Sequence, residues 1–151
     1  MTQRLDYESL APKALQGLGS VHAYVSSSGL PGDLVDLIYL RVSQINGCAY
    51  CIDLHARDAR KRDVSVEKLL LVSAWREGGR LFSERERAAL AWAESLTHVS
   101  TTGAPDADFA AVSAQFSAQE VTDLTVAIAL MNAYNRIGVG FRKPPSSAAD
   151  A

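Results

Sequence analysis

Apolar residues recur every three or four positions through most of this 151-residue chain, which is the spacing of helices with one buried face. The first such stretch runs from Tyr7 to Ser28 and predicts one long helix. Glycine and proline within residues 27–32 then favour a turn, and Asp33 is a candidate N-cap for the next element. The apolar positions of the first helix are Leu10, Ala14, Leu18, Val21 and Val25.

Further helices follow from the same periodicity and from capping signals. They are expected over residues 34–45, 48–62, 66–75, 84–97, 106–116 and 121–137. Ser65 is a candidate N-cap, and Ser83 with Glu86 and Ser117 with Glu120 have the spacing of capping boxes. The stretch 34–45 is apolar on nearly every side, so we expect it to be buried by the fold or by a subunit partner.

These patterns predict an all-α, single-domain helical bundle. A chain of this length can bury a core of its own, and it shows no alternating strand pattern, no internal linker and no tandem repeat. We place the domain over residues 1–142. Residues 143–151 contain two prolines followed by small residues, and we expect them to form a flexible C-terminal tail.

Composition and charge exclude several classes of protein. The net charge is −2 and no basic stripe is present, which argues against binding nucleic acid. No run approaches the roughly 18 to 20 apolar residues of a membrane span. The N-terminus lacks the apolar core of a signal peptide. A close cysteine pair in such a chain is typical of catalysis, redox sensing or metal binding in the cytoplasm, where we expect the protein to act.

Both cysteines lie in one short motif, Cys48-Ala-Tyr-Cys51-Ile-Asp-Leu-His55. On a helix, His55 lies on the same face as Cys51, and Cys48 lies one turn toward the N-terminus within disulfide reach. The break at Asn46-Gly47 places Cys48 in the first turn, where free backbone N–H groups favour a thiolate. The motif therefore predicts a redox-active site with two unequal thiols.

Other interpretations of these residues remain open. Cys48, Cys51 and His55 could supply three ligands to zinc, but a structural zinc site needs four and no second cysteine pair exists. Asp36 lies in the apolar stretch before the motif and is either the acid that orients His55 or the partner of Arg41 or of an arginine from another subunit.

Three further aromatic or basic residues also have candidate positions. Tyr39 and Tyr50 flank Cys48 and could line a substrate pocket, whereas His22 is expected to be a solvated or interface residue.

The segment from Asp36 to His55 resembles the core motif of the alkylhydroperoxidase D / carboxymuconolactone decarboxylase superfamily, which places an acid twelve residues before Cys-x-x-Cys-x-x-x-His. The similarity continues through residues 82–92 and 132–136. The resemblance implies an AhpD-like helical subunit that oligomerises through apolar helices, as a hexamer built from three dimers or as a dimer.

The same resemblance implies a thiol-dependent peroxidase. Cys51 would attack the peroxide, Cys48 would resolve the oxidised sulfur as a disulfide, and His55 with Asp36 would relay protons. No cofactor is expected, but a thiol reductant protein or another external dithiol reductant is needed, with a small-molecule peroxide as substrate. The alternatives are a redox-sensing or disulfide-exchange oligomer and a carboxymuconolactone decarboxylase-type lyase.

Two positions depart from the family pattern. The family acid is usually glutamate, so Asp36 is one methylene shorter, and Tyr50 stands where the best-known peroxidases have histidine.

Overall fold

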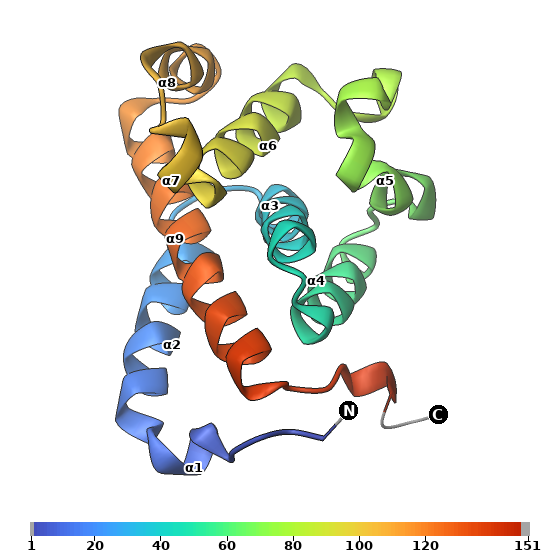
Figure 1. Ribbon diagram of the computed structural model, residues 1–151. Helices are drawn as coiled ribbons and strands as arrows, with labels where there is room; N and C mark the ends of the chain where they lie inside the picture. Colours follow the sequence, from blue (N-terminus) through green and yellow to red (C-terminus); the bar gives the residue numbers. More distant parts are fainter. Residues whose placement is uncertain (1, 149–151) are drawn as a thin grey trace.

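Helices form nearly all of the chain that the computed structural model describes, residues 2–148 (Figure 1). The α-helices are α1 (Tyr7–Leu10), α2 (Pro12–Ser27), α3 (Gly32–Asn46), α4 (Ala49–Lys61), α5 (Val66–Leu71), α6 (Glu84–Thr97), α7 (Val99–Thr102), α8 (Asp106–Ser113) and α9 (Ala118–Phe141). Three 3₁₀ turns are η1 (Val72–Glu77), η2 (Gly79–Leu81) and η3 (Ser146–Ala148). These residues contain no strand, and the all-α prediction is confirmed.

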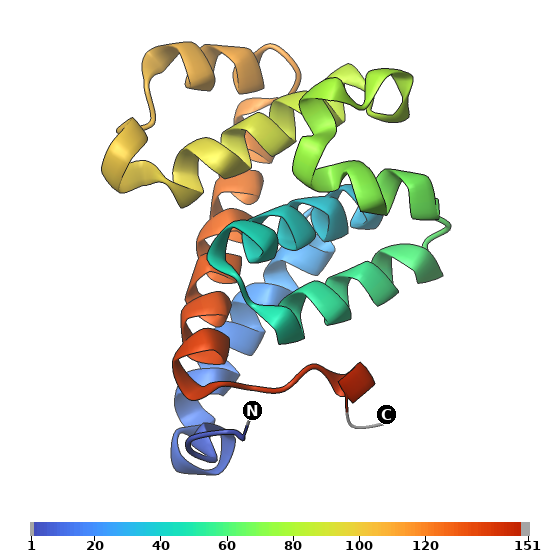
Figure 2. The same cartoon turned by 45° about the vertical axis from the view of Figure 1, so that its right-hand side comes forward.

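Helix α3 lies at the centre of the fold. It packs against α4, α6 and α9, which surround it on three sides (Figures 1 and 2). Leu37, Ile38 and Val42 are fully buried, so the prediction that this helix is covered on nearly every side is confirmed. Burial of one such side chain stabilises the fold by roughly 1.5 to 3 kcal/mol, which makes α3 the main source of packing energy around the site.

Several helix boundaries differ from the prediction. The first expected helix is broken between α1 and α2 because Pro12 cannot donate a backbone hydrogen bond and starts a new helix at its first position. Helix α3 is preceded by Pro31 as N-cap, and Asp33 lies within its first turn. Helix α5 tightens into the 3₁₀ turn η1 after Leu71.

The later helices follow their capping signals closely. Both capping boxes form, with the hydroxyls of Ser83 and Ser117 accepting the N–H groups of Glu86 and Glu120. Helix α9 runs on to Phe141, four residues beyond the expected end, and a short helix, α7, lies between the helices expected over residues 84–97 and 106–116. Among the described residues, no helix is long and apolar enough to span a membrane.

Glu94 of α6 connects three elements. Its carboxylate accepts hydrogen bonds from Arg41 Nε of α3 at 2.7 Å and from Trp75 Nε1 of η1 at 2.9 Å, and it pairs with Arg76. The carboxylate is largely buried, so its partners depend on it for their hydrogen bonds. This cluster fixes η1 against the central helix.

Replacing Glu94 with alanine should lower the free energy of unfolding by about 3 kcal/mol, because Arg41 and Trp75 lose a buried acceptor. Urea unfolding at pH 7 measures this change. Glu84→Ala, an exposed acid of the same helix, is the control and should cost less than about 1 kcal/mol. Equal losses in the two variants would show that the cluster does not stabilise the fold.

The stabilisation by Glu94 should also depend on pH. Burial raises the pKa of this carboxyl, but the hydrogen bonds from Trp75, Arg76 and Arg41 outweigh it and hold the pKa below its ordinary value of 4.5. A lowered folded-state pKa gives stability that is complete above about pH 4.5 and is lost as the pH falls through the folded value. The difference in unfolding free energy between wild type and Glu94→Gln should therefore shrink in acid.

The first and last segments of the described chain lie beside the lower end of α9 (Figure 1). The backbone N–H of Arg4 donates to the carbonyl of Phe141 at 2.9 Å, and Lys143 Nζ pairs with Glu8 Oε1. Residues 143–148 belong to the segment predicted to be a flexible tail, and here the Ser147 N–H donates to the Asp53 carboxylate of α4 at 3.2 Å. The flexibility of this segment stays a prediction. Residues 149–151 of that expected tail lie outside the described residues.

Candidate active site

A sharp turn between α3 and α4 positions both cysteines. Gly47 ends α3 in the left-handed conformation at φ 67°, which glycine adopts without steric cost. Helix α4 then folds back along α3, as Figure 2 shows. This reversal brings Asp36 of α3 beside His55 of α4, although the two are separated by 19 positions in the chain.

A buried amide network holds the turn in place. Asn46 Nδ2 donates to Asn132 Oδ1 at 2.9 Å and to Asn135 Oδ1 at 3.0 Å. Asn135 in turn donates to the hydroxyl of Ser43 at 3.0 Å. The sequence indicated these asparagines only as part of the family resemblance. Their structural role is to bind the end of α3 to α9 beneath the cysteines.

The two thiols occupy different positions at the start of α4. Cys48 is the N-cap residue, and its Sγ accepts the backbone N–H of Cys51 at 3.4 Å. Cys51 lies in the first turn of α4. Cys48 is predicted to lie in that turn but instead precedes it by one position. The sulfurs are joined in a disulfide, and both side chains are almost fully buried. The predicted disulfide pairing is therefore geometrically available.

The disulfide lies directly under α9 at Gly138. A Cβ atom at this position would stand 3.0 Å from Cys48 Sγ and 3.6 Å from Cys51 Sγ. Helix α9 can approach the sulfurs this closely because Gly138 has no side chain.

His55 lies one turn beyond Cys51 and is buried, with 6% of the residue exposed. The ring of Tyr39 meets it edge-on, with 4.9 Å between the ring centroids. His55 Nδ1 stands 3.8 Å from Asp36 Oδ1, which is too long for a direct hydrogen bond, and this nitrogen has no hydrogen-bond partner among the described residues. Asp36 is one methylene shorter than glutamate, which leaves this gap between the carboxylate and the imidazole.

Asp36 has a second partner that the sequence did not predict. Arg62, the C-cap of α4, donates from Nε to Asp36 Oδ2 at 3.0 Å. Arg41, the partner considered from the sequence, pairs with Glu94 instead, because it lies on another face of α3. Asp36 is thus a buried carboxylate placed between His55 and Arg62, and it can orient the imidazole while Arg62 balances its charge.

A cavity of about 350 Å³ opens beside Cys51 and His55. Most of its lining is apolar or aromatic, contributed by α2, α4 and α9. These residues include Leu15, Tyr50, Leu54, Met131, Tyr134 and Ile137. Tyr50 lines it as expected, whereas Tyr39 contacts His55 from behind. His22, expected to be a solvated or interface residue, is exposed yet also lines the cavity, because α2 crosses the site.

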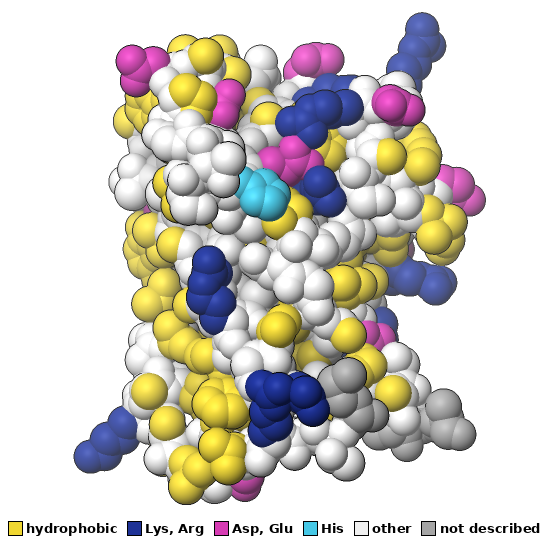
Figure 3. All heavy atoms as spheres, in the orientation of Figure 1, with side chains coloured by type: hydrophobic (Ala, Val, Ile, Leu, Met, Phe, Trp, Pro, Cys, Tyr) yellow, Lys and Arg dark blue, Asp and Glu magenta, His cyan; other side chains and the backbone are white. Residues whose placement is uncertain are grey.

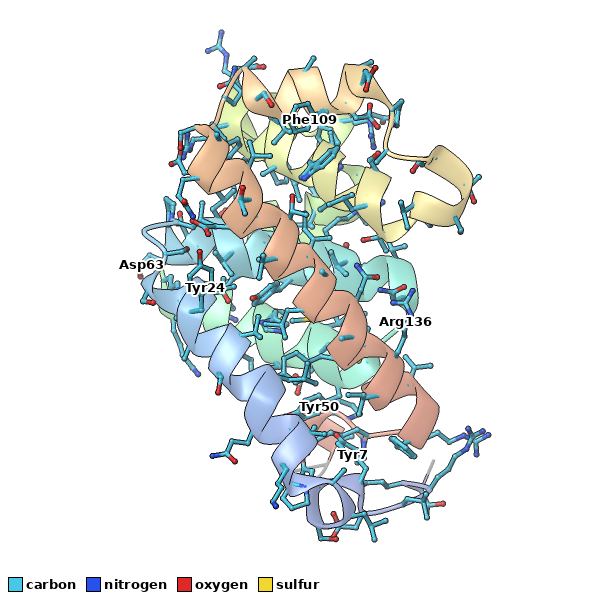
Figure 4. All side chains as sticks on the ribbon, turned by 90° about the vertical axis from the view of Figure 1, so that its left-hand side faces the viewer. Tyr7, Tyr24, Tyr50, Asp63, Phe109 and Arg136 are labelled. Carbon is cyan, nitrogen blue, oxygen red and sulfur yellow. A yellow bond between two sulfur atoms is a disulfide. The ribbon has the colours of Figure 1, made fainter. Side chains whose placement is uncertain are left out.

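The mouth of the cavity carries an ion pair. Lys143 Nζ bonds to Glu8 and lies 4.3 Å from the centre of the Tyr50 ring. Burial lowers the pKa of Lys143, but the bond to Glu8 and the neighbouring tyrosines outweigh it and raise the pKa above its ordinary value. Burial raises the pKa of Tyr7, whose ring lies beside this pair and near Tyr50 (Figure 4). The mouth therefore keeps a charged Lys143 and a neutral Tyr7 at physiological pH.

The described residues contain no group of three or more His, Cys, Asp or Glu side chains that could hold a metal ion.

Comparison with known proteins identifies the family of this chain. Residues 11–95, more than half of the chain and the part that contains the cysteines, His55 and Asp36, match the carboxymuconolactone decarboxylase family. The chain belongs to the carboxymuconolactone decarboxylase family. A family relative, the uncharacterized protein YdfG of Bacillus subtilis, is 33% identical over 139 residues, covering 92% of this chain and 94% of the relative.

Solved structures of similar proteins share the fold. A protein of unknown function from Agrobacterium tumefaciens, suggested to be the antioxidant defence protein AhpD, is 41% identical with a TM-score of 0.92, covering 95% of this chain and 98% of that one. The debrominase Bmp8 is 19% identical with a TM-score of 0.78, covering 93% of this chain and 75% of that one, and it shares the fold alone. The AhpD-like fold predicted from the sequence is therefore confirmed.

Proposed function

We propose that this protein is a thiol peroxidase that reduces organic hydroperoxides or hydrogen peroxide. The observation that carries the proposal is the placement of Cys51 between His55, a second thiol and a largely apolar cavity. The suggested antioxidant role of the Agrobacterium relative supports it. The reaction consumes one hydroperoxide and two thiols and gives an alcohol, a water molecule and a disulfide.

Each step has a residue suited to it. The Cys51 thiolate attacks the terminal peroxide oxygen, the O–O bond breaks, and His55 delivers a proton to the departing alkoxide. The Cys48 thiolate then attacks the sulfenic acid sulfur of Cys51, and hydroxide leaves as water after protonation. Asp36 acts as a positioning residue that orients His55 through a water across the 3.8 Å gap. No cofactor takes part in these steps.

The lining of the cavity favours organic hydroperoxides. Leu15, Leu54 and Ile137 provide apolar contacts for an alkyl or aryl group, and the volume of about 350 Å³ accommodates a small organic molecule. Hydrogen peroxide would fit but would gain nothing from these contacts, so larger hydroperoxides should have the lower KM.

A turnover assay tests the proposal. Reduced protein mixed with cumene hydroperoxide should form one intramolecular disulfide per peroxide consumed, and dithiothreitol should then sustain many turnovers. Peroxide loss is followed colorimetrically and the disulfide by mass spectrometry after alkylation. A disulfide that forms without sustained turnover would favour a redox sensor. Lactone decarboxylation without peroxide consumption would favour the lyase.

Two further properties belong to the proposal. We propose a homo-oligomer, a hexamer or a dimer, because α1 and α2 expose Leu10, Val21 and Tyr24 along one side of the subunit, where Figure 3 shows hydrophobic side chains gathered. We also propose a cytoplasmic setting, where a thiol reductant, either a protein or a small molecule, would return the pair to its dithiol form.

A further inference from the structure

The two sulfurs of the disulfide open onto different cavities. Cys51 lines the cavity with His55 described above, and Cys48 does not. Cys48 instead lines a second cavity of about 470 Å³, which Cys51 does not line. Its other walls are the end of α9 and the segment that follows it, including Gly138, Arg142, Pro144 and Pro145. We call this space the Cys48 cavity.

We propose that the Cys48 cavity is the binding site for the reducing thiol, and that it selects small thiols carrying a carboxylate or sulfonate. This inference rests on the peroxidase proposal for its biological purpose, but the disulfide chemistry is testable without any peroxide. It gives the two halves of the catalytic cycle separate binding sites on opposite sides of one sulfur pair.

The geometry of disulfide exchange supports this division. A thiolate attacks one sulfur of a disulfide from the side opposite the other sulfur, which leaves as a thiolate. A reductant in the Cys48 cavity reaches Cys48 Sγ without crossing the peroxide cavity. The leaving sulfur is then Cys51, which lies one turn before His55 on α4 and lines the same cavity as that imidazole, a group that favours a thiolate.

The charge of the lining indicates the class of thiol. Arg142 and Lys143 both line the Cys48 cavity, and no acidic side chain does so among the described residues. Lys143 is already paired with Glu8, whereas Arg142 is exposed. Figure 3 shows basic side chains where the C-terminal segment leaves α9. An anionic group near the attacking sulfur would therefore be attracted to this site.

The reduction proceeds in two exchanges. The first thiolate forms a bond to Cys48 Sγ, the Cys48–Cys51 bond breaks, and Cys51 leaves as a thiolate that can take a proton from the protonated form of His55. A second thiolate attacks the sulfur of the bound reductant, and Cys48 leaves as a thiolate. The products are the protein dithiol and one oxidised reductant disulfide, so two thiols supply the two electrons.

Gly138 controls the approach to the attacked sulfur. It lines the Cys48 cavity, and a Cβ there would press on Cys48 Sγ at 3.0 Å. Gly138→Ala should therefore slow reduction of the disulfide about tenfold or more by shielding this sulfur. Gly140→Ala, in the same helix with no atom within 4 Å of its new Cβ, is the matched control and should react like wild type.

The first measurement locates the attack. Oxidised protein is mixed with 2-mercaptoethanesulfonate, quenched within milliseconds by acid, alkylated and mapped by peptide mass spectrometry. The adduct should lie on Cys48, leaving Cys51 alkylated. An adduct found first on Cys51 would overturn the proposal, whether or not the protein proves to be a peroxidase.

The second measurement tests the charge preference. Disulfide reduction is timed with 2-mercaptoethanesulfonate, 2-mercaptoethanol and cysteamine, which carry negative, neutral and positive groups, with rates expressed per thiolate. The sulfonate should react about fivefold faster than the neutral thiol at low salt, and cysteamine more slowly. Arg142→Asn, which suits the left-handed backbone at φ 55°, should reduce this preference to less than about twofold.

A matched variant controls for net charge. Arg80→Gln removes an exposed cation far from the Cys48 cavity and should retain the wild-type preference. An unchanged preference in Arg142→Asn, or equal rates for the three thiols in wild type, would contradict the proposed selectivity. The absence of peroxide turnover would contradict the proposed function alone, because these reductions are measured on the isolated disulfide.

Discussion

Replacing Cys51 with serine is expected to abolish peroxide consumption, with a loss of more than about a thousandfold. A serine hydroxyl is not ionised at neutral pH and cannot attack peroxide oxygen as a thiolate does. Cys48 cannot substitute for it, because Cys48 lies outside the cavity that contains His55. Stopped-flow mixing with cumene hydroperoxide measures the loss in the reduced protein.

Cys48→Ser is the matched control for this prediction. It removes a thiol of the same size from the same turn but leaves Cys51 and His55 in place. This variant should consume one equivalent of peroxide in a single burst, form a sulfenic acid on Cys51 that a dimedone probe labels, and then stop. A burst retained in Cys51→Ser and lost in Cys48→Ser would reverse the roles assigned to the two thiols.

The sequence predicted the parts of this site that depend on local spacing. Helix periodicity and capping residues located most helices, since both depend on residues three or four positions apart. The turn at Asn46-Gly47 and the Cys-x-x-Cys-x-x-x-His spacing placed Cys51 beside His55 for the same reason. The cost of burying an acid in an apolar helix made Asp36 a candidate partner of His55, and the resemblance to a known family then gave it the same role.

Other contacts could not be predicted because they depend on how separate helices meet. Arg62 reaches Asp36 only because α4 folds back along α3, and nothing in the spacing of these two residues indicates it. His22 lines the cavity because α2 crosses α4 and α9. The expected tail forms the wall of two cavities, since Lys143 is drawn to Glu8 from the other end of the chain. The prolines and small residues of the segment 143–151 do not indicate that Lys143 pairs with Glu8.

His55→Ala should slow the peroxide reaction about a hundredfold, because the thiolate loses its neighbouring base and the alkoxide loses its proton donor. The loss should be smaller with an oxidant whose leaving group is a weaker base, since acetate from peracetic acid depends less on protonation than the alkoxide from cumene hydroperoxide. Rates for cumene hydroperoxide and peracetic acid compare the two cases. A uniform loss with both oxidants would assign His55 to thiolate activation alone.

Asp36 separates positioning of His55 from direct chemistry. Asp36→Ala should lower the rate of the peroxide reaction about tenfold, because the imidazole of His55 is then free to rotate. The cost in stability should be small, because Arg62 is more than half exposed and remains solvated.

Asp36→Glu adds one methylene, enough to close the 3.8 Å gap to His55 Nδ1 into a direct hydrogen bond. It should therefore retain or exceed the wild-type rate, and the pH profile, altered in Asp36→Ala, should keep its wild-type form. Asp33→Asn, an exposed acid of the same helix, should change neither quantity. If Asp36→Ala, which keeps His55, reacted as fast as wild type, the role of the Asp36 carboxylate would be limited to its ion pair with Arg62.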